Sequence, residues 1–492
     1  MHHRKIREIS ASEAAECVEH GQTLACSGFS LAGNPKKIPV ALARRAERLH
    51  AEGKPFKVKL FAGASVGDLL DGQLSRAGAV SRRMPYQSNP SMRDLINDSQ
   101  IAYVDSHLSH FPQQLAYGFL GELDWLIVEV CDFSDDGELV LSSSVGAVPT
   151  FCRMAKRILI ELNTFHPKEL RGIHDIYIPE NPPHRQPIPL RAVGDRIGAE
   201  TVRVDPAKIV GFVPTSEPDE VQEFKESNGI YEKISEHIAQ FLIREMEEGR
   251  VPSSFLPLQS GVGNVANGVL AALGRCLPPF QMYSEVVQNA VIDLIVAGRI
   301  RLASASALVV TSDYSKRIYG DLKFFKERLI LRPQEIANHP EILRRLGVIS
   351  INTALEVDLF GHVNSTHLFG SGIVNGIGGS GDFTRNGYIS IFVLPSVAKE
   401  GRISSLVPMC SHVDHIEHDV QVVATEWGVA DLRGKDPSER AREIIEKCAH
   451  PDYRPILRHS LENGKKGHIR QNLSEAFRLH RAYLENGDMR LV

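Results

Sequence analysis

Residues 255–298 read FLPLQSGVGNVANGVLAALGRCLPPFQMYSEVVQNAVIDLIVAG, and this stretch decides the fold. It predicts a strand, a glycine turn, a helix, a second strand that ends at Glu285, and a second helix. Gly261 and Gly263 carry no Cβ, so a turn built on them lets backbone N–H groups approach a ligand. Strands that alternate with helices indicate parallel βαβ units, and in open α/β sheets ligands bind at the carboxyl ends of strands.

Two interpretations of this stretch are open on these residues alone. The glycine turn could place N–H donors on an oxyanion, and the carboxylate of Glu285 could act as a nucleophile. Alternatively, the turn only joins a strand to a helix, and the carboxylate only complements the dipole at a helix start. A G-x-G pattern without the longer dinucleotide fingerprint does not decide between them.

Length and composition indicate a cytoplasmic enzyme of ordinary globular type. A chain of 492 residues is long enough for about two to four domains. Its 56 basic and 60 acidic residues are well mixed, which gives no indication of a nucleic-acid or membrane partner. The seven cysteines occur singly, as in a reducing compartment. We expect no signal peptide and no transmembrane span, because no apolar run is long enough.

The pattern of the whole chain predicts two domains. The polar segment 216–228 precedes an amphipathic helix expected at 230–248. We therefore place the boundary there, with an N-terminal α/β domain over 1–222 and a C-terminal α/β domain over 223–492 that carries Glu285.

Two pairs of phrases recur in the same order in the two halves. Ser27-Gly-Phe at a strand end resembles Ser260-Gly-Val-Gly, and Glu129-Val-Cys-Asp resembles Glu356-Val-Asp-Leu further along each half. The repeat predicts duplicated α/β halves. We interpret Glu129 and Glu356 as structural carboxylates. Neither serine lies in a G-x-S-x-G motif, so a serine hydrolase is unsupported.

Two further loops are candidates for ligand binding. The run Asn375-Gly-Ile-Gly-Gly-Ser-Gly-Asp has four glycines in six positions, a backbone-entropy cost that favours close ligand approach over a simple bend. The phrase His412-Val-Asp-His-Ile-Glu-His418 has residues that can bind zinc. It lacks a spacing such as HExxH, so we interpret it as ordinary loop histidines.

Several long phrases resemble the acetyl-CoA hydrolase/transferase family, which contains succinyl-CoA:acetate and propionyl-CoA:succinate CoA-transferases. The resemblance runs nearly from end to end. It implies two similar CoA-transferase-type α/β domains with the active site between them, and a homodimer. The phrases that carry it are Ser27-Gly-Phe, Gln259-Ser-Gly-Val-Gly-Asn-Val-Ala-Asn, Tyr283-Ser-Glu-Val, Gly361-His-Val-Asn-Ser-Thr-His, Asn375-Gly-Ile-Gly-Gly-Ser-Gly-Asp-Phe, Ser411-His-Val-Asp-His and Thr425-Glu-Trp-Gly-Val-Ala-Asp-Leu-Arg-Gly.

The resemblance also implies which residues form the site. Glu285 is implied as the nucleophile, with Asn338 and Glu426 orienting the substrate or the nucleophile and the N–H of Gly379 as an oxyanion donor. No metal and no permanently bound cofactor are implied, since coenzyme A is a substrate. Contacts with coenzyme A are implied for Gly261, Val262, Gly263, Asn264, Val265, Asn375, Gly379 and Lys399.

The implied activity is the transfer of CoA between a short-chain acyl-CoA (propionyl-, acetyl- or succinyl-CoA) and a carboxylate such as succinate or acetate. A glutamyl-CoA thioester on Glu285 would be the intermediate. Three alternatives stay open. They are an acetyl-CoA hydrolase that uses the same site, a non-catalytic module that binds CoA or a sugar phosphate, and a metal hydrolase.

Overall fold

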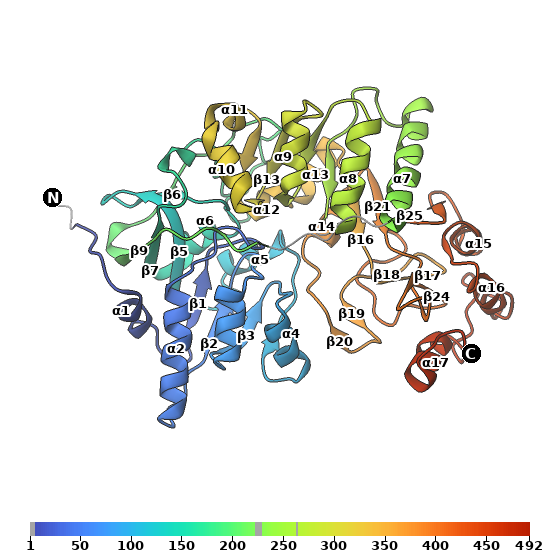
Figure 1. The fold of residues 1–492 in the computed structure, drawn as a ribbon, viewed down its shortest axis with the longest axis horizontal. Coiled ribbons are helices and arrows are strands. Elements are labelled where there is room, and N and C mark those ends of the chain that lie inside the picture. The colour runs from blue at the N-terminus through green and yellow to red at the C-terminus, as the bar shows by residue number, and fades with distance from the viewer. Residues whose placement is uncertain (1–4, 222–228, 262–263) are drawn as a thin grey trace. The chain divides into compact units, whose positions relative to one another are not determined.

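The computed structural model describes residues 5–221, 229–261 and 264–492, without the side chains of 264–267 (Figure 1). Its contacts divide into two compact units. Unit 1 is Met1–Glu223, Met282–Ile295 and Leu302–Arg345, and unit 2 is Phe224–Gln281, Val296–Arg301 and Leu346–Val492. The predicted boundary at 222/223 falls in a segment outside the described residues and stays a prediction. No helix in the described ranges is long and apolar enough to cross a membrane.

The first large sheet lies within the N-terminal part of the chain. Among the described residues it has nine strands, and those of its main path run parallel. Antiparallel strands β6 (Glu138–Leu141) and β8 (Val202–Arg203) extend from β5. The spatial order of the main path is β4 (Ala102–Tyr103), β3 (Val80–Met84), β2 (Val58–Phe61), β1 (Thr23–Cys26), β5 (Leu123–Phe133), β7 (Ala155–Asn163) and β9 (Ile209–Thr215).

The second large sheet has eight strands in the described part of the chain. Its last strand, β26, is antiparallel to β25. The spatial order is β15 (Leu329–Leu331), β13 (Ile300–Ala305), β11 (Phe280–Tyr283), β10 (Leu258–Ser260), β16 (Ile349–Thr353), β21 (Ile389–Val393), β25 (Val422–Thr425) and β26 (Gly428–Asp431).

The two sheets repeat one topology. In each, the first strand lies in the middle, the next three parallel strands follow on one side, and the chain then returns to the other side for three more parallel strands. The antiparallel strands β6 and β8 in the first sheet and β26 in the second are additions to this common pattern. Strand β1 therefore corresponds to β10, β2 to β11 and β5 to β16. This confirms the predicted α/β class with duplicated halves. The pairs β1/β5 and β10/β16 are topological switch points, where α/β sheets bind ligands beyond the strand ends.

Local sequence explains why these elements form. Strand β5 is a nearly continuous buried run, as expected when both faces of a parallel sheet are covered. Helix α2 (Ile38–Ala51) has Pro39 in its first turn, and its first N–H groups donate to the carboxylate of Glu161 from β7. Asp436 and Glu439 form a capping box at the start of α15 (Pro437–Cys448).

The other helices have the following bounds. They are α1 (Ala11–Glu16), η1 (Asp68–Gly72), α3 (Gln73–Arg76), α4 (Pro90–Asn97), α5 (His110–Ala116), α6 (Val148–Met154), η2 (Lys168–Leu170), η3 (Pro206–Lys208), α7 (Gly229–Glu247), α8 (Asn264–Cys276), α9 (Asn289–Val296), α10 (Ser312–Gly320), α11 (Leu322–Lys326), α12 (Gln334–Ala337), α13 (Pro340–Leu346), α14 (Ser380–Asn386), α15 (Pro437–Cys448), α16 (Arg454–Glu462) and α17 (Arg478–Asn486).

Short strand pairs complete the fold. They are β12 (Val286–Val287) with β14 (Ala307–Leu308), β17 (Glu356–Asp358) with β18 (Val363–Asn364) and β24 (Leu406–Val407), β19 (His367–Leu368) with β20 (Gly372–Ile373), and β22 (Val397–Ala398) with β23 (Ile403–Ser404). The second helix predicted within residues 255–298 does not follow Glu285 directly but starts at Asn289, because Val286 and Val287 pair with β14. The strand predicted from Phe255 likewise starts later, at Leu258, since Phe255 has a φ of +60°.

Candidate active site

Glu285 lies in a bend between β11 and β12, in unit 1, and is partly exposed. Backbone hydrogen bonds hold the chain at Ser284, directly before Glu285, and at the carbonyl of Glu285 itself. The N–H of Ser284 donates to the carbonyl of Ser304 at 2.9 Å, and the N–H of Ser306 donates to the carbonyl of Glu285 at 2.8 Å. The predicted nucleophile therefore sits at the end of a buried strand with its backbone fixed.

Asn338 contacts this carboxylate directly. Its Nδ2 donates to Glu285 Oε1 at 2.8 Å, and the residue is fully buried at the C-terminal end of α12. Helix α12 is held in turn by the hydroxyl of Tyr283, which donates to the carbonyl of Ile336 at 2.7 Å. The strand that leads to Glu285 and the helix that presents Asn338 are thus tied together.

An apolar cluster surrounds the strand that follows Glu285. Tyr86 packs against this cluster, and burial raises its pKa to about 12, with a smaller contribution from the negative charge of Glu285. The hydroxyl is therefore neutral at physiological pH. The buried members of the cluster are Phe29, Ala32, Ala64, Leu108, Val286 and Ala307.

A three-stranded ladder carries the Glu285 backbone. Strand β12, directly after Glu285, pairs parallel with β14. On the other side of β14 lies the segment 142–146, which forms an antiparallel bridge from Ser144 to Ala307. The N–H of Val145 donates to the carbonyl of Ser306 at 2.9 Å, and the N–H of Leu308 donates to the carbonyl of Ser143 at 2.8 Å.

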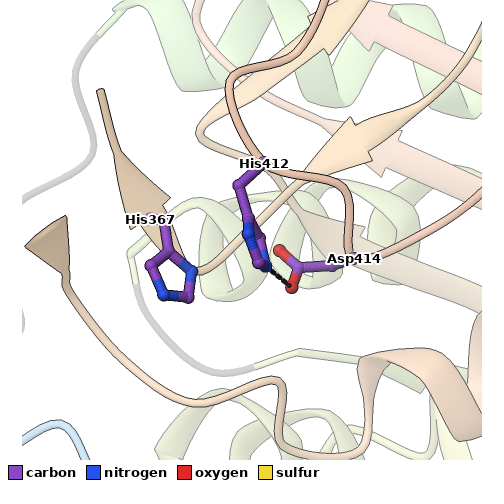
Figure 2. A group of neighbouring side chains, drawn as sticks. All are labelled: His367, His412 and Asp414. Atoms are coloured by element: carbon purple, nitrogen blue, oxygen red, sulfur yellow. Dashed lines mark ion pairs between the residues drawn. The ribbon is translucent and has the colours of Figure 1, made fainter. Parts of the chain in front are cut away.

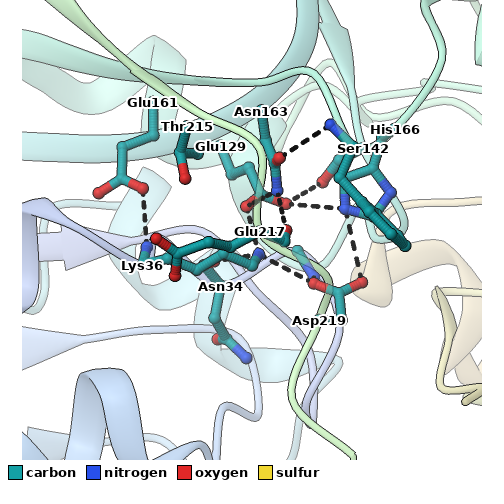
Figure 3. A network of polar contacts seen from close by, with 12 residues as sticks. Asn34, Lys36, Glu129, Ser142, Glu161, Asn163, His166, Thr215, Glu217 and Asp219 are labelled. Carbon is teal, nitrogen blue, oxygen red and sulfur yellow. Dashed lines mark hydrogen bonds and ion pairs between the residues drawn. The ribbon is translucent and has the colours of Figure 1, made fainter. Parts of the chain in front are cut away.

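A buried polar network lies beside the segment 142–146, at the carboxyl ends of β1, β7 and β9 (Figure 3). Lys36 Nζ forms ion pairs with Glu129 and, at 3.0 Å, with Asp219. Burial alone would lower the pKa of Lys36, but these two carboxylates raise it. Burial alone would raise the pKa of Glu129, but Lys36 and His166 hold it at about 2. Glu129 is therefore ionised at neutral pH and paired with Lys36, which agrees with a structural role for Glu129.

Other contacts connect this network to the surrounding loops. The hydroxyl of Ser142 donates to Glu129 at 2.7 Å, and the hydroxyl of Ser143 donates to Asp219. The N–H of Gly33 donates to Asp219 at 3.0 Å. Sequence reasoning missed the network as a unit, because its members are far apart in the chain and follow no local motif.

Glu426 lies in unit 2, in the turn between β25 and β26. Its carboxylate accepts bonds from the N–H of Ser396 at 2.9 Å and from the Ser396 hydroxyl at 2.5 Å. The indole of Trp427 donates to the same hydroxyl at 3.0 Å, and this indole is partly exposed. The turn thus presents a fixed carboxylate beside an aromatic surface.

The glycine turn after β10 is described only in part. Gly261 donates its N–H to the carbonyl of Ile351 at 3.0 Å, so this particular N–H is used within the sheet. Val262 and Gly263 lie outside the described residues. Asn264 and Val265 open helix α8.

The remaining predicted CoA contacts also lie in unit 2. The amide of Asn375 donates to the carbonyls of Ser365 at 3.2 Å and Gly376 at 2.9 Å. Gly379 is buried at the start of α14. Lys399 is exposed in the turn between β22 and β23, with a φ of +50°.

The histidine-rich phrase does not converge as a unit. His412 pairs with Asp414 at 3.2 Å, and the ring of His367 lies 3.9 Å from that of His412 (Figure 2). The donor atoms of these three residues lie within 4.8 Å of one another. However, Thr366 and Ser365 donate to Asp414, and Thr366 also bonds His367 Nδ1 at 2.6 Å. His367, His412 and Asp414 therefore each have a polar partner within the protein, and their interpretation as ordinary loop residues stays a prediction.

Comparison with known proteins identifies the family of the chain and relatives of its fold. Residues 2–214 match the acetyl-CoA hydrolase/transferase N-terminal domain, and residues 315–461 match the C-terminal domain of that family. The chain is 48% identical to the propanoyl-CoA:succinate CoA transferase of Escherichia coli K12, over 98% of each chain. It is 44% identical to the succinyl-CoA:acetate CoA-transferase of Clostridium kluyveri, over 99% of this chain and 91% of that one. RipA from Yersinia pestis has the same fold, with a TM-score of 0.71 at 22% identity, over 93% of this chain and 97% of RipA.

The duplicated α/β fold and these relatives define an enzyme of the CoA-transferase type. The chain belongs to the acetyl-CoA hydrolase/transferase family.

Proposed function

We propose that the chain is an acyl-CoA:carboxylate CoA-transferase that carries CoA as a thioester on Glu285. The hydrogen bond from Asn338 Nδ2 to Glu285 Oε1 is the observation that supports this most directly. This bond orients the carboxylate of Glu285, which is partly exposed. Short acyl groups such as propionyl, acetyl and succinyl are the proposed substrates, because the relatives are named for them.

The proposed reaction proceeds through two anhydrides. The Glu285 carboxylate attacks the thioester carbonyl, and CoA leaves as a thiolate. The thiolate then attacks the glutamyl carbonyl of the anhydride, which releases the acyl group as a carboxylate and leaves glutamyl-CoA. An acceptor carboxylate attacks this thioester and expels CoA again. Attack of the thiolate on the acceptor's carbonyl regenerates Glu285 and releases the new acyl-CoA, so the thioester energy is kept as long as water is excluded.

The other predicted residues receive roles in this scheme as proposals. The N–H of Gly379 stabilises the oxyanion, and Glu426 orients the substrate. Coenzyme A is a substrate and no permanent cofactor is needed. Contacts with it are proposed for Gly261, Val262, Gly263, Asn264, Val265, Asn375, Gly379 and Lys399. A homodimer and a domain boundary at 222/223 are proposed as well; the family's N-terminal domain, which ends at residue 214, supports the boundary.

Steady-state kinetics tests this function against its alternatives. A transferase consumes acyl-CoA only when a carboxylate acceptor is present, and it gives parallel lines in double-reciprocal plots. A hydrolase would release CoA at the same rate without acceptor, and a relative at 39% identity is named as the acetyl-CoA hydrolase of Schizosaccharomyces pombe. A non-catalytic module binds CoA without turnover.

A further inference from the structure

The carboxylate of Asp219 lies at one end of a chain of contacts that leads to Glu285, within unit 1. Asp219 accepts the hydroxyl hydrogen of Ser143, and its side chain is only 9% exposed. Ser143 is itself buried, and its carbonyl accepts the N–H of Leu308 in β14 at 2.8 Å. The side chain of Ser143 thus faces the ion network while its backbone belongs to the ladder.

The hydrogen bonds of the ladder connect Ser143 with the proposed nucleophile, Glu285. Next to Ser143, Val145 donates to the carbonyl of Ser306, and Gly146 donates to the Ser306 hydroxyl at 3.2 Å. Ser306 then donates its own N–H to the carbonyl of Glu285. Ser306 is fully buried and bonded on both sides, so a shift of the segment 142–146 is transmitted to the Glu285 backbone.

Asp219 can hold Ser143, in the segment 142–146 of this ladder, because other residues hold the Asp219 carboxylate in place. One carboxylate oxygen accepts bonds from Lys36 Nζ and from the N–H of Gly33, both at 3.0 Å, and the other accepts the Ser143 hydroxyl. Charge-assisted bonds of this kind, when buried, are stronger than neutral ones. The ion pair with Lys36 therefore anchors the acceptor for Ser143.

We propose that Asp219 is a positioning residue that acts through Ser143 and Ser306 to hold Glu285 in its reactive place. This inference rests on the proposed role of Glu285 as nucleophile. Small misplacements of a reacting group reduce rates strongly, whereas the binding of CoA through other residues does not depend on this ladder.

The test compares Ser143→Ala and Asp219→Asn with Glu220→Gln as the matched control. Glu220 is the adjacent carboxylate, and it accepts the N–H groups of Asp68 and Leu69 instead. Formation of the glutamyl-CoA thioester is followed in a single turnover, well below the melting temperature of each variant. We expect the rate constant to fall about tenfold in the first two variants, with the Kd for CoA unchanged and the control near wild type.

The double variant Ser143→Ala with Asp219→Asn provides a second readout. If Asp219 acts through Ser143, the double variant is no slower than the slower single variant. Rates within about twofold of wild type for Ser143→Ala, multiplicative losses in the double variant, or an equal loss in Glu220→Gln would each overturn the proposal. Absence of the thioester in the wild-type protein would instead refute the proposed function, so the two failures are distinguishable.

Discussion

Asn338 Nδ2 lies 2.8 Å from Glu285 Oε1 and donates a hydrogen bond to it. Asn338 is fully buried, whereas Glu285 is partly exposed. The buried amide of Asn338 therefore holds one carboxylate oxygen of Glu285, while the side chain of Glu285 remains partly accessible to solvent. A nucleophilic carboxylate needs this combination of orientation and access.

Asn338→Ala should slow thioester formation about 100-fold, because the carboxylate of Glu285 then loses the hydrogen bond from the Asn338 amide that orients it. Single-turnover kinetics with an acyl-CoA measures the effect. Asn289→Ala is the control, since the Asn289 amide bonds Thr311 and does not contact Glu285 in the described contacts. A loss of equal size in the control would show that the effect is general.

Tyr283→Phe should destabilise the protein by about 0.5–1.5 kcal/mol, because it removes one buried hydrogen bond to the carbonyl of Ile336, which keeps the N–H of His339 as a second donor. Urea unfolding of the full chain measures the free energy of unfolding. Tyr314→Phe is the matched control, because its hydroxyl bonds Asp293 at the surface. We expect little change in the free energy of unfolding of Tyr314→Phe. Equal losses of stability in both variants would contradict the role of the Tyr283 hydrogen bond.

Gly261→Ala should weaken CoA binding about tenfold and leave the melting temperature unchanged. An added Cβ would lie 3.6 Å from the carbonyl of Ile351, an ordinary contact, so folding tolerates it. Calorimetric titration with CoA measures the affinity. In contrast, Gly63→Ala would place a Cβ 2.5 Å from the carbonyl of Gly28 and should lower stability. Unchanged CoA affinity in Gly261→Ala would remove the turn from the proposed binding site.

Glu245 should contribute a pH-dependent part of the stability of unit 2. Burial alone would raise its pKa, but Arg250 and Arg433 lower it to about 2 from an ordinary value of 4.5. Because the folded-state pKa is lowered, the contribution is complete above pH 4.5 and is lost as the pH falls towards 2. Glu245→Gln should therefore be less stable than wild type at pH 7, and the difference should shrink over that range. A difference independent of pH would contradict the ion pairs.

Local pattern was enough to predict much of this fold. Strand β5 is visible in the sequence as a nearly continuous apolar run, and helix α7 is visible because its apolar residues repeat with the helical period. The strand that ends at Glu285 is predicted from the sequence as well. The contact of Glu285 with Asn338 was implied only by family resemblance, since the two residues are 53 positions apart.

Tertiary contacts decide the parts that the sequence did not predict. Val286 and Val287 are compatible with a helix or a strand, and only their pairing with β14 makes them β12. Lys36 meets Glu129 across 93 positions and Asp219 across 183, and no spacing rule covers such distances. The ladder that holds Glu285 follows from the same long-range contacts.

Trapping of the glutamyl-CoA thioester shows whether Glu285 carries CoA. The protein is mixed with propionyl-CoA without acceptor, treated with borohydride, and measured by intact mass and peptide mapping. If Glu285 carries the thioester, we expect reduction of residue 285 to the alcohol, and no such change in Glu285→Gln. An unmodified Glu285 in a preparation that transfers CoA to carboxylates, or a modification at another residue, would contradict it.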